Sequence, residues 1–454
     1  METVLAAHLL HGRLVGDNVR FVRVVTDTRA VEKGDLFVAL KGDRFDGHDF
    51  VADAFERGAI AALVMRDRVP RDGGSLIEVD DPLAALGRLA AHWRHQFRIP
   101  VIVIVGSNGK TTVKEMVASI LRAHFGEHVL ATHGNLNNAI GLPLTLLGLR
   151  STHRAAVIEL GMNHPGETAE LARIAQPTIA LINNAQREHQ EFMRSVADVA
   201  QEHASLLLHL PREGIAVLNA DDSHVATWRA AVPEHASIVD FGLSHTAAVR
   251  GEFDAEGTGL RLHMRTPDAA TSIHMHVAGG HNARNALGAA AAALAAGVSM
   301  PAVAEGLAAF RPVKGRLVAR RGLRGQAVID DTYNANPDSV RAAITVLAGA
   351  PSPRCLVLGD MGEVGDQGPA FHREAGEAAR AAGVDHLFTV GTLAAEATHA
   401  FGAGAEHFDS VEALLRALSK GEAHYASVLI KGSRFMRMER VVAALCGDAA
   451  EGAH

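Results

Sequence analysis

The chain has 454 residues, which is too long for one hydrophobic core and predicts two to four domains. Its 44 lysines and arginines against 51 aspartates and glutamates give a formal net charge of −7, and without a basic cluster we expect no binding to nucleic acid. Two cysteines in a chain of this length, Cys355 and Cys446, are typical of a reducing compartment. The N-terminal sequence lacks the pattern of a signal peptide. The longest apolar run, residues 286–297, is too short to cross a bilayer. We therefore expect a cytoplasmic monomer that does not insert into membranes.

Residues 1–82 are predicted to form a small α/β domain. Three segments have the composition of short strands, and one segment with Asp and Gly near its start has the pattern of a helix. The strands are RVVTDTR (23–29), GDLFVAL (34–40) and IAALVM (60–65), and the helix is DGHDFVADAFERGA (46–59). Asp81-Pro82 has the composition of a turn and is our predicted domain boundary.

Residues 83–311 are predicted to form a central domain built on a mostly parallel sheet. An amphipathic helix (83–97) precedes the strand PVIVIV. AAVIEL (155–160) and TIALINN (178–184) are short apolar runs of the kind that parallel sheets bury, with the helical GETAELARIA (166–175) between them. The alternating patterns within 236–277 predict antiparallel strands added at the edge of the sheet.

Residues 312–454 are predicted to form a third, Rossmann-like α/β domain. Helical segments alternate with short strands, which end in polar residues. The strands are AVIDD (327–331), RCLVLGD (354–360), HLFTVG (386–391) and SVLIKGS (427–433). The predicted fold class is thus α/β, with three domains.

The segment GSNGKTT (106–112) lies between a predicted strand and a predicted helix, where a phosphate-binding loop would lie. The generic pattern would place its first glycine at Ile104, so only the GKTT core fits. Such a loop would let Lys110 reach the terminal phosphates of ATP and Thr111 bind Mg²⁺. The alternative is an ordinary connection between a strand and a helix. The expected nucleotide-binding residues are Gly106, Ser107, Asn108, Gly109, Lys110, Thr111 and Thr112.

Polar residues follow other predicted strands as well, and ligands of open α/β sheets bind at the carboxyl ends of strands. Glu159 and His189 are candidate Mg²⁺ ligands there. Taken singly, each could equally be an ordinary loop residue. If the third domain closes on the second, Asp331, Asn334, Lys431 and Arg434 would face the nucleotide.

These motifs together resemble the Mur ligases, the ATP-dependent amide-forming enzymes of bacterial peptidoglycan synthesis. GSNGKTT matches the short phosphate-binding loop of that family, G-[ST]-x-G-K-T-[ST], which explains the misfit at Ile104. TDTRAVEKGDLFVALKGDRFDGHDF (26–50) is similar to a UDP-binding start. Four further segments are similar to family segments in the same order: NNAIGLPLTLL (137–147), VIELGMNHPGE (157–167), GGHNARNAL (279–287) and DDTYNANPDS (330–339).

Segment 330–339 most resembles the members that act on D-alanyl-D-alanine. The resemblance implies that ATP phosphorylates the terminal carboxylate of a UDP-MurNAc-tripeptide and that the amine of D-alanyl-D-alanine attacks the acyl phosphate. A sibling ligase of the tripeptide-forming or folylpolyglutamate type is one alternative. A nucleotide-binding protein that has lost catalysis is another.

The resemblance also implies roles for single residues. Lys110, Glu159, His189 and Arg316 would be catalytic, with Arg316 directed at the γ-phosphate. Asn282 would contact adenine and Asp331 the ribose. The residues expected to bind the UDP-MurNAc-tripeptide or D-alanyl-D-alanine are Thr28, Arg29, Asn137, Asn138, Asn334, Lys431 and Arg434.

One departure from the family pattern concerns a metal site. The family usually carries a carbamoylated lysine about fourteen residues after the histidine, but that position is His203, and the chain has no lysine between Lys114 and Lys314. We expect an existing carboxylate to replace the carbamate and choose Glu202, which adds to Thr111, Glu159 and His189 as metal ligands. Glu188 and Glu191 are the alternatives.

Overall fold

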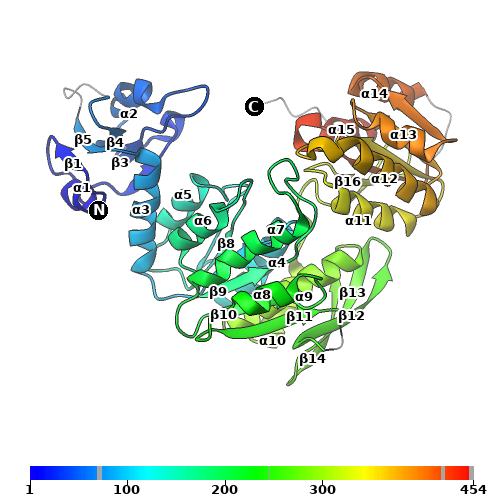
Figure 1. Cartoon of the computed structure of the whole chain (residues 1–454), viewed down its shortest axis with the longest axis horizontal. Helices are drawn as coiled ribbons and strands as arrows, with labels where there is room; N and C mark the ends of the chain where they lie inside the picture. The colour runs from blue at the N-terminus through cyan, green and yellow to red at the C-terminus, as the bar shows by residue number, and fades with distance from the viewer. Residues whose placement is uncertain (69–73, 245, 421–424, 449–454) are drawn as a thin grey trace.

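The computed structural model describes residues 1–68, 74–244, 246–420 and 425–448, and its strands form three separate sheets. We call the parts built on them the N-terminal, central and C-terminal units. The N-terminal and C-terminal units lie at opposite ends of the long axis, with the central unit between them (Figure 1). The predicted α/β fold class is confirmed, while the exact domain boundaries stay a prediction.

The N-terminal unit has a sheet of strand order β1-β5-β4-β3-β2, parallel except for β1 at its edge. The predicted strand at 23–29 is shorter than expected, because Asp27 accepts a hydrogen bond from the backbone N–H of Arg29 and begins a 3₁₀ turn at Thr28–Ala30. The elements are α1 Thr3–Leu9, β1 Arg13–Val15, β2 Arg23–Val25, β3 Asp35–Val38, a 3₁₀ turn Gly47–Phe50, α2 Val51–Glu56, β4 Ala61–Met65 and β5 Ser75–Val79.

Helix α3 (Pro82–His95) joins the N-terminal unit to the central unit. Asp81 caps it by accepting hydrogen bonds from the backbone N–H groups of Leu83 and Ala84, at 2.8 and 3.1 Å. Leu86 and Leu89 pack into the core of the N-terminal unit, whereas Ala90 packs into the core of the central unit. The helix is therefore shared by both cores.

The central unit has a nine-stranded sheet of order β14-β13-β12-β11-β10-β9-β6-β8-β7. The predicted antiparallel edge is confirmed for β12 to β14, but β11 pairs parallel with both of its neighbours. The strands are β6 Val101–Val105, β7 Val129–Ala131, β8 Ala155–Glu159, β9 Ile179–Ile182, β10 Ile215–Asn219, β11 Ser237–Gly242, β12 Val249–Glu256, β13 Gly259–Arg265 and β14 Ala270–Met275. The helices are α4 Lys110–Phe125, α5 Gly141–Leu147, α6 Glu167–Ala175, α7 Val196–Ala204, the 3₁₀ turn Ser205–His209, α8 Val225–Ala231, α9 Gly280–Ala295 and α10 Met300–Ala309.

Strand β6 lies inside this sheet and is apolar on both faces. Ile102 and Ile104 belong to one hydrophobic core, while Val101, Val103 and Val105 belong to the core on the opposite face. A strand covered on both faces needs apolar residues at every position, which explains the uninterrupted VIVIV sequence.

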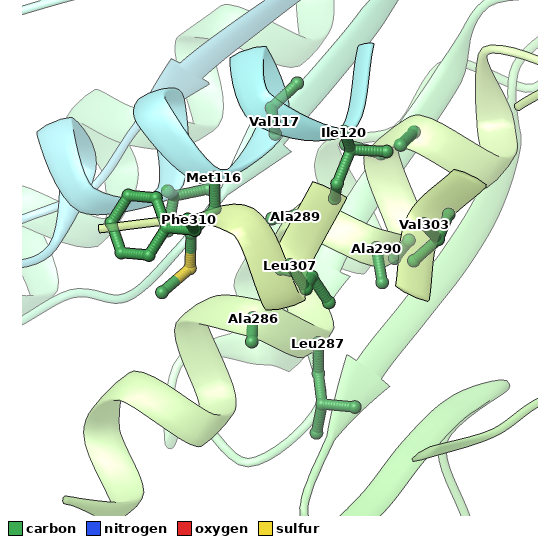
Figure 2. Close-up of a cluster of buried hydrophobic side chains, with 14 of the residues drawn as sticks. Met116, Val117, Ile120, Ala286, Leu287, Ala289, Ala290, Val303, Leu307 and Phe310 are labelled. Atoms are coloured by element: carbon green, nitrogen blue, oxygen red, sulfur yellow. The ribbon is translucent and has the colours of Figure 1, made fainter. Parts of the chain in front are cut away.

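Helices α4, α9 and α10 pack together on one face of the central sheet. Figure 2 shows Met116 and Ile120 of α4 beside the alanines of α9 and Leu307 of α10. Small side chains let these helices approach closely, and Gly306 of α10 lies directly against α4: a Cβ atom built there would be 2.3 Å from the Cα atom of Ile120.

Substitution Gly306→Ala should destabilise the chain, although alanine favours helix more than glycine by about 1 kcal/mol. The added methyl group meets backbone, which cannot rotate away, so we expect a net loss of roughly 1–3 kcal/mol and a lower midpoint of thermal unfolding. Gly87→Ala in α3 is the matched control, since its Cβ would meet only the movable Ile174 Cδ1 atom. Equal effects of the two substitutions would contradict this account.

The C-terminal unit has a sheet of order β15-β16-β20-β17-β18-β19, parallel except for β15. Its strands are β15 Val318–Arg321, β16 Ala327–Asp331, β17 Arg354–Gly359, β18 His386–Val390, β19 Ala405–Phe408 and β20 Ser427–Lys431. Its helices are α11 Pro337–Ala348, the 3₁₀ turn Gly365–Gln367, α12 Gly368–Ala381, α13 Ala395–Phe401, α14 Val411–Lys420, the 3₁₀ turn Arg434–Met436 and α15 Glu439–Cys446. None of the helices in the described residues is long and apolar enough to cross a membrane.

Candidate active site

A cavity of about 1060 Å³ lies between the central and C-terminal units. It opens at the carboxyl end of β6, which has β8 on one side and β9 on the other. The chain leaves β6 toward β7 and β8 on one side, and the connection after β8 crosses to β9 on the other side of β6. The strand order therefore reverses at β6, and such a point of an α/β sheet is where ligands bind. In the central unit, the residues that line the cavity come mainly from the loops after β6, β7, β8, β9 and β10 and from the start of α9. In the C-terminal unit they come from the segment before β15, from the segments after β16 and β17, and from the end of β20.

The loop between β6 and α4 is built around two glycines. Gly109 has φ +80° and caps α4, and a Cβ there would lie 2.7 Å from Asn285 Oδ1. Gly106 has φ +145°, also in the region that favours glycine. Asn183 and Asn184 at the end of β9 each donate a 2.8 Å hydrogen bond to the carbonyl of Asn108. The loop is thus held so that the free N–H groups of the first turn of α4 face the cavity.

Lys110, the first residue of α4, has a folded-back side chain. Its Nζ atom hydrogen-bonds to the carbonyl oxygens of Gly106 and Ser107 and lies 3.3 Å from Glu188 Oε2. Thr111 and Thr112 follow it and line the same cavity. The residues of the GSNGKTT segment from Ser107 onward therefore surround a space that an anion could enter.

Glu159, at the end of β8, presents one carboxylate oxygen without a partner. Oε1 accepts a 2.7 Å hydrogen bond from Asn137 Nδ2, whereas Oε2 is buried and has no hydrogen-bond partner among the described residues. A buried carboxylate oxygen in the cavity that Thr111 also lines fits a hard cation such as Mg²⁺. No group of three or more His, Cys, Asp or Glu side chains in the described residues is arranged to hold a metal. That is consistent with Mg²⁺, which usually takes one or two carboxylates plus phosphate oxygens and water.

Glu188 is a buried carboxylate on the floor of the cavity. Its Oε1 atom lies 3.1 Å from His203 Nε2, and His189 Nε2 lies 3.8 Å from its Oε2. Burial alone would raise the pKa of Glu188, but the charge of Lys110 and the hydrogen bond from His203 outweigh it and lower the pKa to about 2. Glu188 therefore stays ionised inside the protein.

The structure contradicts the prediction that Glu202 supplies a metal ligand. Glu202 does not line the cavity, and its two oxygens accept 2.8 Å hydrogen bonds from the backbone N–H groups of Gly166 and Thr168 at the start of α6. It serves as the cap of that helix, because the first N–H groups of a helix have no partner within it. Adjacent residues on a helix point about 100° apart, and His203 therefore contacts Glu188 while Glu202 contacts the start of α6.

The C-terminal unit contributes a second set of polar groups to the cavity. Lys431 is buried and donates a 2.5 Å hydrogen bond to Asp331 Oδ2 and a 2.9 Å bond to the carbonyl of Asn334. The guanidinium of Arg316 stacks 4.0 Å above the ring of Tyr333, and its Nε is buried without a hydrogen-bond partner. Asp331 and Lys431 meet because β16 and β20 are parallel neighbours that end at the same edge of the sheet.

Several contacts join the two units directly across the cavity. Arg187, after β9, forms ion pairs with Asp338 and Glu374, at 2.6 and 2.7 Å, and the hydrogen bond from Arg187 lowers the pKa of Glu374 to about 2. The side chains of Asn108 and Asn336 hydrogen-bond to each other. His189 Nδ1 lies 2.7 Å from Glu363 Oε2. His189, expected to bind metal, is thus paired with the C-terminal unit here.

The cavity brings together most of the predicted site residues. Asn137, Asn138, Glu159, His189, Asn282, Arg316, Asp331, Asn334 and Lys431 line it together with the loop residues Ser107 to Thr112. Asn282 donates a 2.9 Å hydrogen bond to the carbonyl of Ala278. Thr28, Arg29 and Arg434 do not line it: Arg29 is exposed and paired with Asp27, and Arg434 is exposed beside Glu439.

Several residues that line the cavity were not predicted from the sequence. Among them are His281, Tyr333 and Arg187, and Glu188 was named only as an alternative to Glu202. A usable signal was present for two of them, since Arg187 and Glu188 belong to a continuous polar run, 186–191, directly after a buried strand.

Comparison with known proteins agrees with this geometry. Residues 20–94 match the Mur ligase family catalytic domain, residues 104–293 the Mur ligase middle domain, and residues 315–434 the Mur ligase glutamate ligase domain. The chain is 41% identical over 444 residues to UDP-N-acetylmuramoyl-tripeptide–D-alanyl-D-alanine ligase of Escherichia coli (strain K12), with 96% of each chain covered. It is 33% identical over 435 residues to the ligase of the same name from Bacillus subtilis (strain 168), with 92% of each covered.

Solved structures give the same result. The crystal structure of MurF from Acinetobacter baumannii superimposes with a TM-score of 0.91 at 35% identity, covering 97% of each chain. MurF ligase from Thermotoga maritima in complex with ADP has a TM-score of 0.83 at 27% identity, covering 94% of this chain and 97% of that one. A folylpolyglutamate synthase from Mycobacterium tuberculosis shares the fold, at 18% identity and a TM-score of 0.65 over 80% of this chain. The chain belongs to the Mur ligase family.

Substitution Arg187→Ala should loosen the contact between the central and C-terminal units. It removes both ion pairs and the stacking of the guanidinium 5.2 Å from the centre of the Phe371 ring. We expect a larger radius of gyration of the ligand-free protein in small-angle scattering. Arg341→Ala is the matched control, because Arg341 also pairs with Glu374 but lies in the C-terminal unit, as Glu374 does. An unchanged radius in Arg187→Ala would show that other contacts suffice.

Proposed function

We propose that this chain joins D-alanyl-D-alanine to UDP-N-acetylmuramoyl-tripeptide at the expense of ATP, in the synthesis of peptidoglycan precursors. The products would be UDP-N-acetylmuramoyl-pentapeptide, ADP and phosphate. The observation that carries the proposal is the single cavity in which the GSNGKTT loop and Glu159 face the DDTYNANPDS segment of the C-terminal unit. The full-length similarity to ligases named for this reaction supports the choice of substrates.

In this proposal the central unit binds ATP by its phosphates. The N–H groups at the start of α4 and the Nζ of Lys110 would bind the terminal phosphates, and the lysine would then exchange its present partners for phosphate oxygens. Thr111, Glu159 and His189 would hold Mg²⁺, whose charge offsets that of the phosphates. Glu159 Oε2, which is buried and unpaired, would gain a partner in this way.

The chemistry proceeds in two steps. A free carboxylate is a poor acyl donor, so a carboxylate oxygen of the tripeptide first attacks the γ-phosphorus of ATP, and ADP leaves. The amine of D-alanyl-D-alanine then attacks the acyl carbon, the C–O bond to phosphate breaks, and the amine loses a proton. Two polyanions must meet in the first step, and the cations of Lys110 and Arg316 would lower their repulsion.

The remaining predicted residues would position the reactants. Asn282 would contact adenine and Asp331 the ribose of ATP, from opposite sides of the cavity. Asn137 and Asn138 would contact the muramoyl peptide, Thr28 and Arg29 the uridine, and Asn334, Lys431 and Arg434 the acceptor side. Thr28 and Arg29 lie in the N-terminal unit, and a substrate that spans from there to the cavity would be elongated, as a UDP-linked peptide is.

We further propose that three domains, 1–82, 83–311 and 312–454, divide these tasks in the cytoplasm, within a monomer. The N-terminal domain would bind the UDP end of the substrate, the central domain ATP, and the C-terminal domain the acceptor.

A coupled assay of phosphate release tests the activity directly. The purified chain should release phosphate only when ATP, UDP-MurNAc-tripeptide and D-alanyl-D-alanine are all present. Replacing the acceptor with a diamino acid or with glutamate tests the sibling activities of the family. Release with those acceptors, or binding of ATP with no release at all, would contradict the proposal.

Substitution Lys110→Ala should abolish turnover while leaving the fold intact. The charge of the lysine acts mainly on the transferring phosphoryl group, so we expect a loss in kcat on the order of 10³-fold or more. Circular dichroism would check the fold, and Lys33→Ala, an exposed lysine of the N-terminal unit, would serve as the control. Retention of more than about a tenth of the rate would refute the assigned role.

A further inference from the structure

We propose that Glu188, held in place by His203, supplies a second carboxylate to the divalent cation that accompanies ATP. This inference rests on the proposed use of ATP and Mg²⁺. Glu188 would bind the cation directly, and His203 would act as a positioning residue for Glu188.

The geometry of Glu188 is that of a prepared anionic site. Its side chain is only 5% exposed, and it lines the cavity next to Lys110. Oε1 accepts the hydrogen bond from His203, whereas Oε2 lies 3.3 Å from Lys110 Nζ and 3.8 Å from His189 Nε2. Oε2 is therefore the oxygen that is available to exchange one cation for another.

The ring of His203 has one described hydrogen bond, and that bond goes to Glu188. The ring is 1% exposed, and in the part of the chain that the structure describes its Nδ1 has no hydrogen-bond partner. Donation from Nε2 to the carboxylate fixes the orientation of Glu188, as outer partners do for the ligands of metals. His203 occupies the position at which the sequence analysis noted the absent lysine, so a carbamate cannot form there.

Binding of ATP would disturb the present balance of charge. Once phosphate oxygens take Lys110, Glu188 would be a buried carboxylate with a weakened counter-charge, which is costly. A divalent cation between Glu188 and the phosphates would restore neutrality.

Cation binding can be measured without turnover by titrating Mn²⁺ into the whole chain with a non-hydrolysable ATP analogue and following free Mn²⁺ by electron paramagnetic resonance. Glu188→Gln keeps the size of the side chain and removes its charge, and it should weaken Mn²⁺ binding by about tenfold or more. Glu191→Gln is the matched control, since Glu191 is exposed and lies outside the cavity. Equal Mn²⁺ affinities of Glu188→Gln and the wild type would overturn the proposal.

The positioning role of His203 has its own pair of variants. His203→Gln retains an N–H donor and should bind Mn²⁺ nearly as the wild type does, whereas His203→Leu should bind it less tightly. Equal affinities in these two variants would overturn the role of His203. Removal of dissolved CO₂ should leave the wild-type rate unchanged, and a rate that recovers on adding bicarbonate would mean that a carbamate, not Glu188, supplies the ligand.

Failure of the proposed function would be recognised separately. A chain that binds Mn²⁺ through Glu188 but does not use D-alanyl-D-alanine would disprove the assigned ligase reaction alone. A chain that catalyses the reaction with unaltered Mn²⁺ binding in Glu188→Gln would disprove the present inference alone.

Discussion

The architecture of the site depends on how the loop after β6 is held. Gly109 adopts a left-handed conformation and lies so close to Asn285 of α9 and Asn183 at the end of β9 that no side chain would fit between them. Strand β6, helix α9 and the end of β9 thus meet at one point of the backbone. Because β6 is packed between two hydrophobic cores, the loop that follows it begins at a fixed position in the fold.

The loop belongs to the central unit alone, whereas the cavity is lined by residues of two units. Its walls belong to two units that are joined by several polar contacts: the ion pairs of Arg187, the paired amides of Asn108 and Asn336, and the contact of His189 with Glu363. Polar contacts of this kind contribute little net stability when they are partly exposed, because water competes for the same groups. An interface of this composition can open and close at small cost in free energy, as an enzyme requires when it takes up two polyanionic substrates and then excludes water.

The buried charges of the cavity follow one pattern. Each unit places a lysine against a carboxylate, Lys110 with Glu188 in the central unit and Lys431 with Asp331 in the C-terminal unit. Glu159 differs, since its Oε2 atom has no hydrogen-bond partner in the part of the chain that the structure describes. A buried charge is tolerated only when it is paired or bound to a metal, and the unpaired oxygen therefore marks where the protein alone is incomplete. The two lysines, in contrast, can exchange their carboxylate partners for other negatively charged groups of a ligand.

Much of this protein could be predicted from the sequence by itself. The strand-loop-helix of residues 101–125, the three α/β units and the motifs that carry the family resemblance are local features, set by periodicity and by glycine at two positions. The contacts of Glu202 and Glu188 could not be predicted, because both are glutamates in polar surroundings close to the predicted metal ligands. Only the tertiary structure shows that Glu202 of α7 binds the free N–H groups of α6, whereas His203 contacts Glu188. Distances between residues far apart in the chain depend on the angles at which helices pack, and no local pattern encodes those angles.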